Sequence, residues 1–78
     1  MDQVNKTFFD AAAAGEVAKV SAMIAQGADV NVANGDGRTA LMRSAKRGHK
    51  QVVQMLLDNG ADPNATDKNG KTAIMAAA

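Results

Sequence analysis

Two stretches of the chain carry apolar side chains three and four positions apart, the spacing that places them on one face of a helix. The stretches are residues 17–26 and 50–59. Their apolar positions are Val17, Val20, Met23 and Ile24, then Val52, Val53, Leu56 and Leu57. Gly27 and Gly60 follow the two stretches, where a residue in the left-handed conformation commonly ends a helix. Each stretch is therefore predicted to form an amphipathic helix with one buried face.

Two shorter helices are predicted immediately before these stretches. One spans residues 39–47, because Thr39 can act as its N-cap and Gly48 breaks the pattern after it. The other spans about residues 6–14. Residues 61–70 are rich in turn-forming side chains, and Pro63 would break a helix there. The predicted order is helix, tight turn, helix, extended loop, and then the next helix.

The chain repeats itself with a period of 33 residues. When residues 1–45 are compared with residues 34–78, 12 of the 45 pairs are identical, against about 4 expected from composition. Conservative pairs such as Leu41 with Ile74 and Ile24 with Leu57 support the same register. A repeat of this length with two helices per unit predicts a solenoid rather than a single globular core.

The loop and first-helix motifs of this repeat resemble those of the ankyrin repeat family. Residues 60–64 read Gly-Ala-Asp-Pro-Asn, and residues 34–49 follow the family signature D-x-x-G-x-T-P-L-H-x-A-A-x-x-G-H with departures. Met42 stands in place of the signature His, and Arg43 stands where an aliphatic residue is usual. The resemblance covers the whole chain and implies an all-α, ankyrin-type helix-turn-helix solenoid with short hairpin loops.

In this register the chain divides into three units. Residues 1–33 are expected to form an amino-terminal cap repeat, residues 34–66 a full repeat, and residues 67–78 a partial repeat. Phe8 and Phe9 fall at the positions of Leu41 and Met42, and two aromatic rings there can cover a terminal surface.

The partial repeat stops within its first helix, so the chain is expected to be a truncated array, natural or engineered, with an apolar carboxyl-terminal face. A face of this kind favours self-association into a homo-oligomer. The residues expected to form it are Val53, Leu56, Leu57 and Ile74.

Composition narrows the class of protein further. The chain has 78 residues, no cysteine and a net charge of +1, so disulfide staples and thiolate metal sites are excluded. No apolar run approaches the length that spans a bilayer, and the amino terminus does not follow a signal-peptide pattern. These features predict a cytoplasmic protein without a membrane partner, and the low net charge makes nucleic acid an improbable partner.

The sequence holds no catalytic or cofactor-binding constellation. His49 is the one histidine, and its place in the inter-helix Gly-His pair favours a structural role. No nucleophile with a positioned base, no phosphate-binding glycine loop and no complete calcium loop is present. We therefore expect a non-enzymatic protein with no cofactor and no metal.

The resemblance implies where a protein partner would bind, because hairpin tips and first-helix ends form the contact face of the family. Carried over by register, these positions are Asp36, Arg38, Lys46, Arg47, Lys68, Asn69 and Lys71. Cations outnumber acids in this set, which favours an acidic partner segment. The same cations are also consistent with a solvated surface and with stabilisation of helix carboxyl ends.

Three functions follow from these interpretations. The first is a protein–protein interaction module, and the second is a repeat fragment without a ligand that self-associates. The third, a nucleic-acid surface on the basic central repeat, requires affinity that falls steeply with salt.

Overall fold

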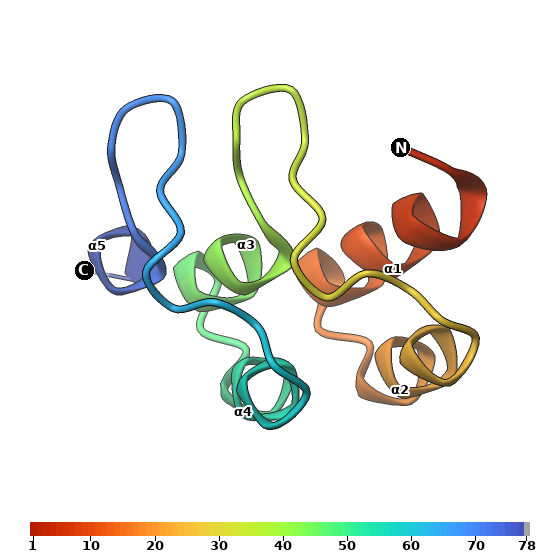
Figure 1. Cartoon of the computed structure of the whole chain (residues 1–78). Coiled ribbons are helices and arrows are strands. Elements are labelled where there is room, and N and C mark those ends of the chain that lie inside the picture. The colour runs from red at the N-terminus through yellow and green to blue at the C-terminus, as the bar shows by residue number, and fades with distance from the viewer. Residues whose placement is uncertain (78) are drawn as a thin grey trace.

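A computed structural model describes residues 1–77 of the chain, and these residues form five α-helices in two layers. The helices are α1 Gln3–Ala14, α2 Val17–Ala25, α3 Ala40–Lys46, α4 Lys50–Asp58 and α5 Ala73–Ala77. The first helices α1, α3 and α5 lie in one row, α2 and α4 lie in a second row, and two loops project from the first row (Figure 1). The predicted helix-turn-helix order is confirmed.

The amino-terminal helix begins earlier than the predicted residue 6. It starts at Gln3, because the side chain of Asp2 accepts a hydrogen bond of 2.8 Å from the backbone N–H of Asn5 and so caps the helix. The helix ends at Ala14 as predicted. Gly15 follows it with φ of 76°, which allows the sharp turn into α2.

The N-cap predicted for the central repeat is present. Thr39 Oγ1 accepts a hydrogen bond from the backbone N–H of Met42 at 3.3 Å, and the Thr39 N–H donates to Met42 Sδ at 3.4 Å. The thioether thus fills the role of a glutamate or glutamine in a capping box. Met42 is buried, so its sulfur bonds within its own helix while its carbons pack against neighbours.

The core lies between the two helix rows. Its largest fully buried side chains are Phe8, Leu56, Val20, Val52 and Ser44. The Ser44 hydroxyl donates to the carbonyl oxygens of Ala40 and Leu41 at 2.9 and 3.1 Å, so this buried polar group is satisfied within α3. Alanines occupy much of the remaining core, which allows the helices to approach closely.

Asparagine side chains join successive repeats at the loops after the second helices. Asn31 Oδ1 accepts the backbone N–H of Asp62 at 2.7 Å, and its Nδ2 donates to the Gly60 carbonyl at 3.2 Å. One repeat earlier in register, the N–H of Asp29 donates to Asn5 Oδ1 at 2.8 Å. Asn5 in α1 thus replaces the loop asparagine that an earlier repeat would supply.

His49 joins the helix layers at the turn before α4. Its Nε2 lies 3.1 Å from the carbonyl oxygen of Ala13 at the end of α1. A Cβ placed on Gly15 would lie 2.7 Å from Nδ1 of the same ring. The imidazole therefore packs directly on the glycine turn of the preceding repeat, in agreement with the structural role predicted for it.

Candidate partner-binding surface

The two projecting hairpins are built on the same side-chain device. In the first hairpin, residues 33–39, Asn34 Oδ1 accepts the backbone N–H groups of Asp36 and Arg38 at 2.9 and 3.0 Å. In the second hairpin, residues 66–72, Asp67 Oδ1 accepts those of Asn69 and Lys71 at 2.8 and 3.0 Å. A side-chain oxygen therefore fixes each turn and positions the basic residue that follows it.

The hairpins also contact each other. The backbone N–H of Lys68 donates to the carbonyl oxygen of Asp36 at 3.0 Å, and Arg38 Nε lies 3.9 Å from Asp67 Oδ2. Gly37 has φ of 74°, and a Cβ there would lie 3.2 Å from the backbone at Asp67 and Lys68. Only glycine fits this close approach without displacing the second hairpin.

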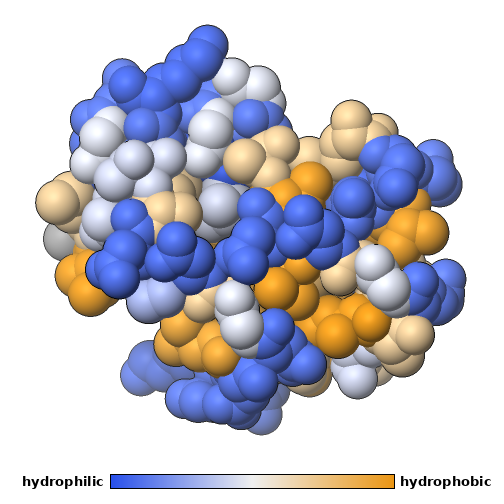
Figure 2. Space-filling model, viewed as in Figure 1, coloured by the Kyte–Doolittle hydropathy of each residue, from blue (hydrophilic) through white to orange (hydrophobic). Residues whose placement is uncertain are grey.

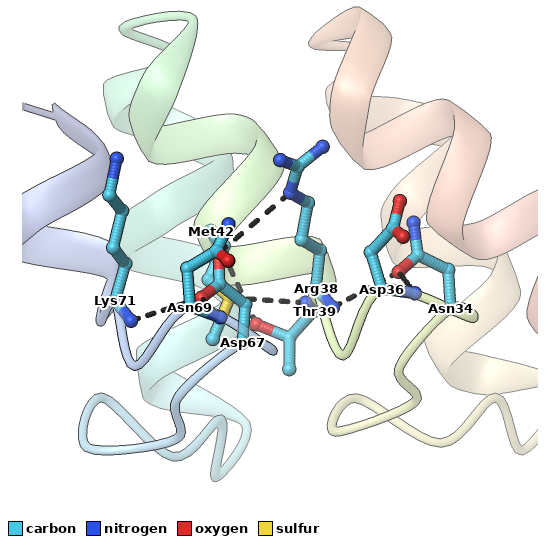
Figure 3. A network of polar contacts seen from close by, with 8 residues as sticks. All are labelled: Asn34, Asp36, Arg38, Thr39, Met42, Asp67, Asn69 and Lys71. Atoms are coloured by element: carbon cyan, nitrogen blue, oxygen red, sulfur yellow. Dashed lines mark hydrogen bonds and ion pairs between the residues drawn. The ribbon is translucent and has the colours of Figure 1, made fainter.

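Asp67 is the electrostatic centre of this arrangement. Its side chain is 8% exposed. The backbone N–H of Lys71 is the main cause that lowers its pKa, with further lowering by the N–H of Asn69 and the charge of Arg38, while burial opposes the shift. The carboxylate is therefore ionised at neutral pH, and the close-up shows it between the upright side chains of Arg38 and Lys71 (Figure 3).

A groove of about 220 Å³ lies where the two hairpins meet α3 and α5. We call it the basic groove, and its lining residues are Arg38, Met42, Arg43, Lys46, Asp67, Lys71, Thr72, Met75 and Ala76. Four of these side chains are cationic and one is a carboxylate, which leaves an excess of three positive charges. Hydrophilic residues also cover the projecting hairpins on the face seen in Figure 2.

The basic groove contains some of the predicted contact residues and not others. Arg38, Lys46 and Lys71 line it. Lys68 and Asn69 lie exposed on the second hairpin, and Asp36 lies exposed on the first. Arg47 is directed elsewhere, because its Nη1 lies 3.4 Å from the carbonyl oxygen of Ala13 at the end of α1.

Sequence reasoning did not assign the carboxylate and thioethers of the groove as site residues. Asp67 aligns with Asn34 in the 33-residue register and with the leading Asp of the loop signature. This alignment is the sequence signal that could have identified Asp67. Met42 and Met75 occupy the signature His positions. Their place in the lining depends on a groove that forms only when two repeats are stacked.

The expected apolar carboxyl-terminal face needs one correction. Leu56 was expected to be partly exposed, but it is fully buried, because its side of α4 faces the core. Leu57, one position on, is 40% exposed, Ile74 is 78% exposed, and Val53 is half-buried. A groove of about 240 Å³ lies here, lined by Leu41, Ala45, Val53, Leu57, Pro63, Ala73, Ile74 and Ala77. We call these residues the open face.

Among residues 1–77, no three His, Asp or Glu side chains gather closely enough to hold a metal ion. Within the same residues, no helix combines the length and the apolar character needed to span a bilayer.

Comparison with known families agrees with the repeat geometry. The family model for ankyrin repeats, in three copies, matches residues 8–78. The chain belongs to the ankyrin repeat family. A relative in rice (Oryza sativa subsp. japonica), named "Probable E3 ubiquitin-protein ligase XBOS33", is 45% identical over 51 residues. The match covers 65% of this chain and 10% of that protein, so the chain corresponds to about a tenth of the relative.

Ankyrin repeats generally mediate protein–protein interaction and are typically not enzymes. The repeats of this chain therefore belong to a class of scaffold that generally contacts other proteins. What the scaffold binds must be argued from its own surface, because a fold does not determine a partner.

Proposed function

We propose that this chain is a non-enzymatic interaction module that binds an acidic segment of a partner protein on the face formed by its hairpins and first helices. The supporting observation is the charge of the basic groove, where four cations face a single carboxylate. That carboxylate, Asp67, already accepts two backbone N–H bonds. An acidic partner would meet an attractive field, which mainly increases the rate of association.

The rigidity of the hairpins supports the same proposal. Each turn is fixed by its own side-chain oxygen, and a backbone hydrogen bond joins the two hairpins. A preorganised surface loses less conformational entropy when a partner binds. The ligase activity named for the rice relative is not proposed for this chain, which corresponds to only 10% of that protein.

A charge-reversal experiment tests this proposal. The probe is a fluorescein-labelled hexaglutamate peptide, with hexaglutamine as its neutral counterpart, followed by fluorescence anisotropy at low and high salt. Wild type should bind hexaglutamate more tightly than hexaglutamine, and added salt should weaken that binding. The double variant Lys46→Glu/Lys71→Glu should lose it, since both residues line the basic groove.

The matched control is Lys19→Glu/Lys50→Glu, which changes net charge equally on exposed positions of α2 and α4. This control should retain most of the affinity. Equal losses in the two double variants would contradict the proposal, because binding would then follow net charge alone. Absence of hexaglutamate binding by wild type would contradict it directly.

A second candidate function is self-association through the open face. All of the residues that line its groove are apolar, and Ile74 is the most exposed of the large hydrophobic side chains. In this proposal residues 1–33 act as a cap repeat, 34–66 as a full repeat and 67–78 as a partial repeat. A second copy of the chain would then cover the partial repeat.

Molar mass in solution tests this second candidate. Light scattering coupled to size exclusion should give twice the 8.0 kDa mass of the chain as concentration rises, and Leu57→Glu/Ile74→Glu should restore the monomer. Ala18→Glu/Ala22→Glu is the control, because both alanines are exposed on α2 and neither lines the open face. A monomeric wild type at every concentration would refute self-association.

A further inference from the structure

Arg43 carries a buried hydrogen-bond donor and lines the basic groove. The residue lies on α3 and is half-buried. Its Nε is buried and has no hydrogen-bond partner among residues 1–77. Native proteins rarely leave a buried donor without an acceptor, because its desolvation is then uncompensated. An acceptor from outside these residues can reach Nε only when the Arg43 side chain shifts, and binding of such an acceptor would satisfy the unpaired donor.

The carboxylate already in the groove does not serve as that acceptor. Asp67 uses Oδ1 for the N–H groups of Asn69 and Lys71, and Oδ2 lies 3.9 Å from Arg38 Nε. The dashed contacts of Figure 3 show that these partners all belong to the hairpins. Arg43 and Lys46 on α3 thus retain positive charge that no carboxylate of the groove is shown to offset.

Apart from Thr72, the uncharged lining of the groove is apolar, and the groove is small. Met42, Met75 and Ala76 line the same groove as Arg43, and thioether side chains adapt readily to an apolar stem. The groove measures about 220 Å³, which is below the range of about 300–1,000 Å³ typical of small-molecule sites. These dimensions suit one side chain of a partner that combines a short methylene stem with a carboxylate.

We propose that the basic groove binds a glutamate side chain of a partner peptide, with the Arg43 Nε–H donating to its carboxylate and Met42 and Met75 contacting its stem. The inference rests on the function proposed above, since it names the ligand group taken by the same surface. An arginine at a position where the family usually has an aliphatic residue becomes the feature that gives this chain its own specificity.

Nuclear magnetic resonance can observe the proposed contact directly. Arginine Nε–H groups give separate signals in ¹H–¹⁵N spectra, and the Arg43 signal is assigned by its loss in Arg43→Leu. Titration with hexaglutamate should shift that signal strongly. The Arg47 signal serves as the internal control and should shift little, because Arg47 lies against α1.

Affinity measurements separate hydrogen-bond geometry from charge. By anisotropy, Arg43→Leu and Arg43→Lys should each weaken hexaglutamate binding at least about five-fold, because a charge-assisted bond from Nε is lost in both variants. Arg47→Leu and Arg47→Lys should change it less than about two-fold. Circular dichroism confirms folding, and Arg43→Lys keeps the test valid if the leucine variant unfolds.

The outcomes distinguish this inference from the function on which it rests. Equal weakening by the Arg43 and Arg47 variants, with hexaglutamate binding intact in wild type, would overturn the glutamate site and leave a diffuse acidic-partner surface. A wild type that binds no hexaglutamate would overturn both. Tighter binding of a hexaphosphoserine peptide, with the Arg43 signal following it, would overturn the assignment to carboxylate.

Discussion

The two ends of the stack carry equivalent residues in opposite environments. Phe8, Leu41 and Ile74 occupy the same position of the 33-residue register. Phe8 is fully buried and Leu41 is 2% exposed, whereas Ile74 is 78% exposed. The hydrophobicity of these side chains differs little, so their burial depends on which neighbouring elements are present. The contribution of a repeat position to stability therefore depends on which neighbouring repeat covers it.

The amino-terminal end of the described residues has features that the central repeat does not share. α1 has 12 residues where α3 has 7, and Asn5 supplies the hydrogen bond that a preceding loop would otherwise make. At the other end, Asn64 stands at the register position of Asn31, and both residues are exposed. The difference between the ends teaches that the amino-terminal end combines a polar contact from Asn5 with the buried ring of Phe8.

The largest expected effect on stability comes from removing a buried ring at the amino-terminal end. Phe8→Ala should lower the free energy of unfolding by about 3–5 kcal/mol, which approaches the whole stability of a domain this small. Ile74→Ala at the equivalent position should change it by less than about 0.5 kcal/mol. Urea denaturation followed by circular dichroism measures both. Similar losses for the two variants would show that the open face is covered in solution.

Substitutions at two equivalent glycines test the same comparison, and their expected effect on stability is smaller. Gly15 and Gly48 are equivalent, with φ of 76° and 74°, but a Cβ on Gly15 would meet His49 whereas one on Gly48 meets nothing within 4 Å. Gly48→Ala should cost about 1 kcal/mol from the left-handed backbone alone. Gly15→Ala should cost roughly twice that or more, because backbone strain and a steric clash combine.

The double variant Gly15→Ala/His49→Ala controls for the clash. Removing the imidazole removes the steric conflict, so the penalty of Gly15→Ala should shrink toward that of Gly48→Ala. A thermodynamic cycle over the four proteins measures this coupling. Additive effects of the two substitutions would contradict the packing of His49 on the turn.

The smallest expected effect is a pH-dependent difference in stability that distinguishes the two hairpins. The pKa of Asp67 is lowered in the folded chain, so its contribution to stability is fully present above its ordinary pKa and is lost as pH falls through the lowered value. Asp67→Asn installs the side chain that Asn34 uses in the first hairpin. The variant should be less stable than wild type at neutral pH, and the gap should close in acid.

Chemical denaturation at a series of pH values measures that gap. The control is Asp36→Asn, which removes an exposed carboxylate from the tip of the first hairpin. A gap for Asp67→Asn that is constant with pH would mean that the charge of Asp67 does not stabilise the second hairpin.

Local signals in the sequence predicted most of the fold. Thr39 as an N-cap and the glycine turns are short-range features, so the helix ends followed from them within a residue or two. The start of α1 was misplaced because Asp2 as a cap was overlooked. Leu56 was assigned together with Leu57 to the apolar carboxyl-terminal face, but successive helix residues are rotated by about 100°, and only packing against α3 decides which of the two is buried.

The candidate site was less predictable because it belongs to no single repeat. Arg38, Lys46 and Lys71 were found by register, since the resemblance marks their positions. The buried Nε of Arg43 and the engaged oxygens of Asp67 arise only when two hairpins and two helices meet. Pairwise geometry of this kind leaves no signal in the spacing of residues along one chain.

The side-chain hydrogen bonds of Asn31 bear on how the proposed module would release a bound acidic segment. An amide carries no charge and does not titrate, so the Asn31 bonds to Asp62 and Gly60 are indifferent to ionic strength and to moderate acidity. The basic groove depends on full charges and responds to both. Salt would therefore release the proposed acidic segment by screening these charges, while this uncharged link between repeats persists, so that release does not require the repeats to separate.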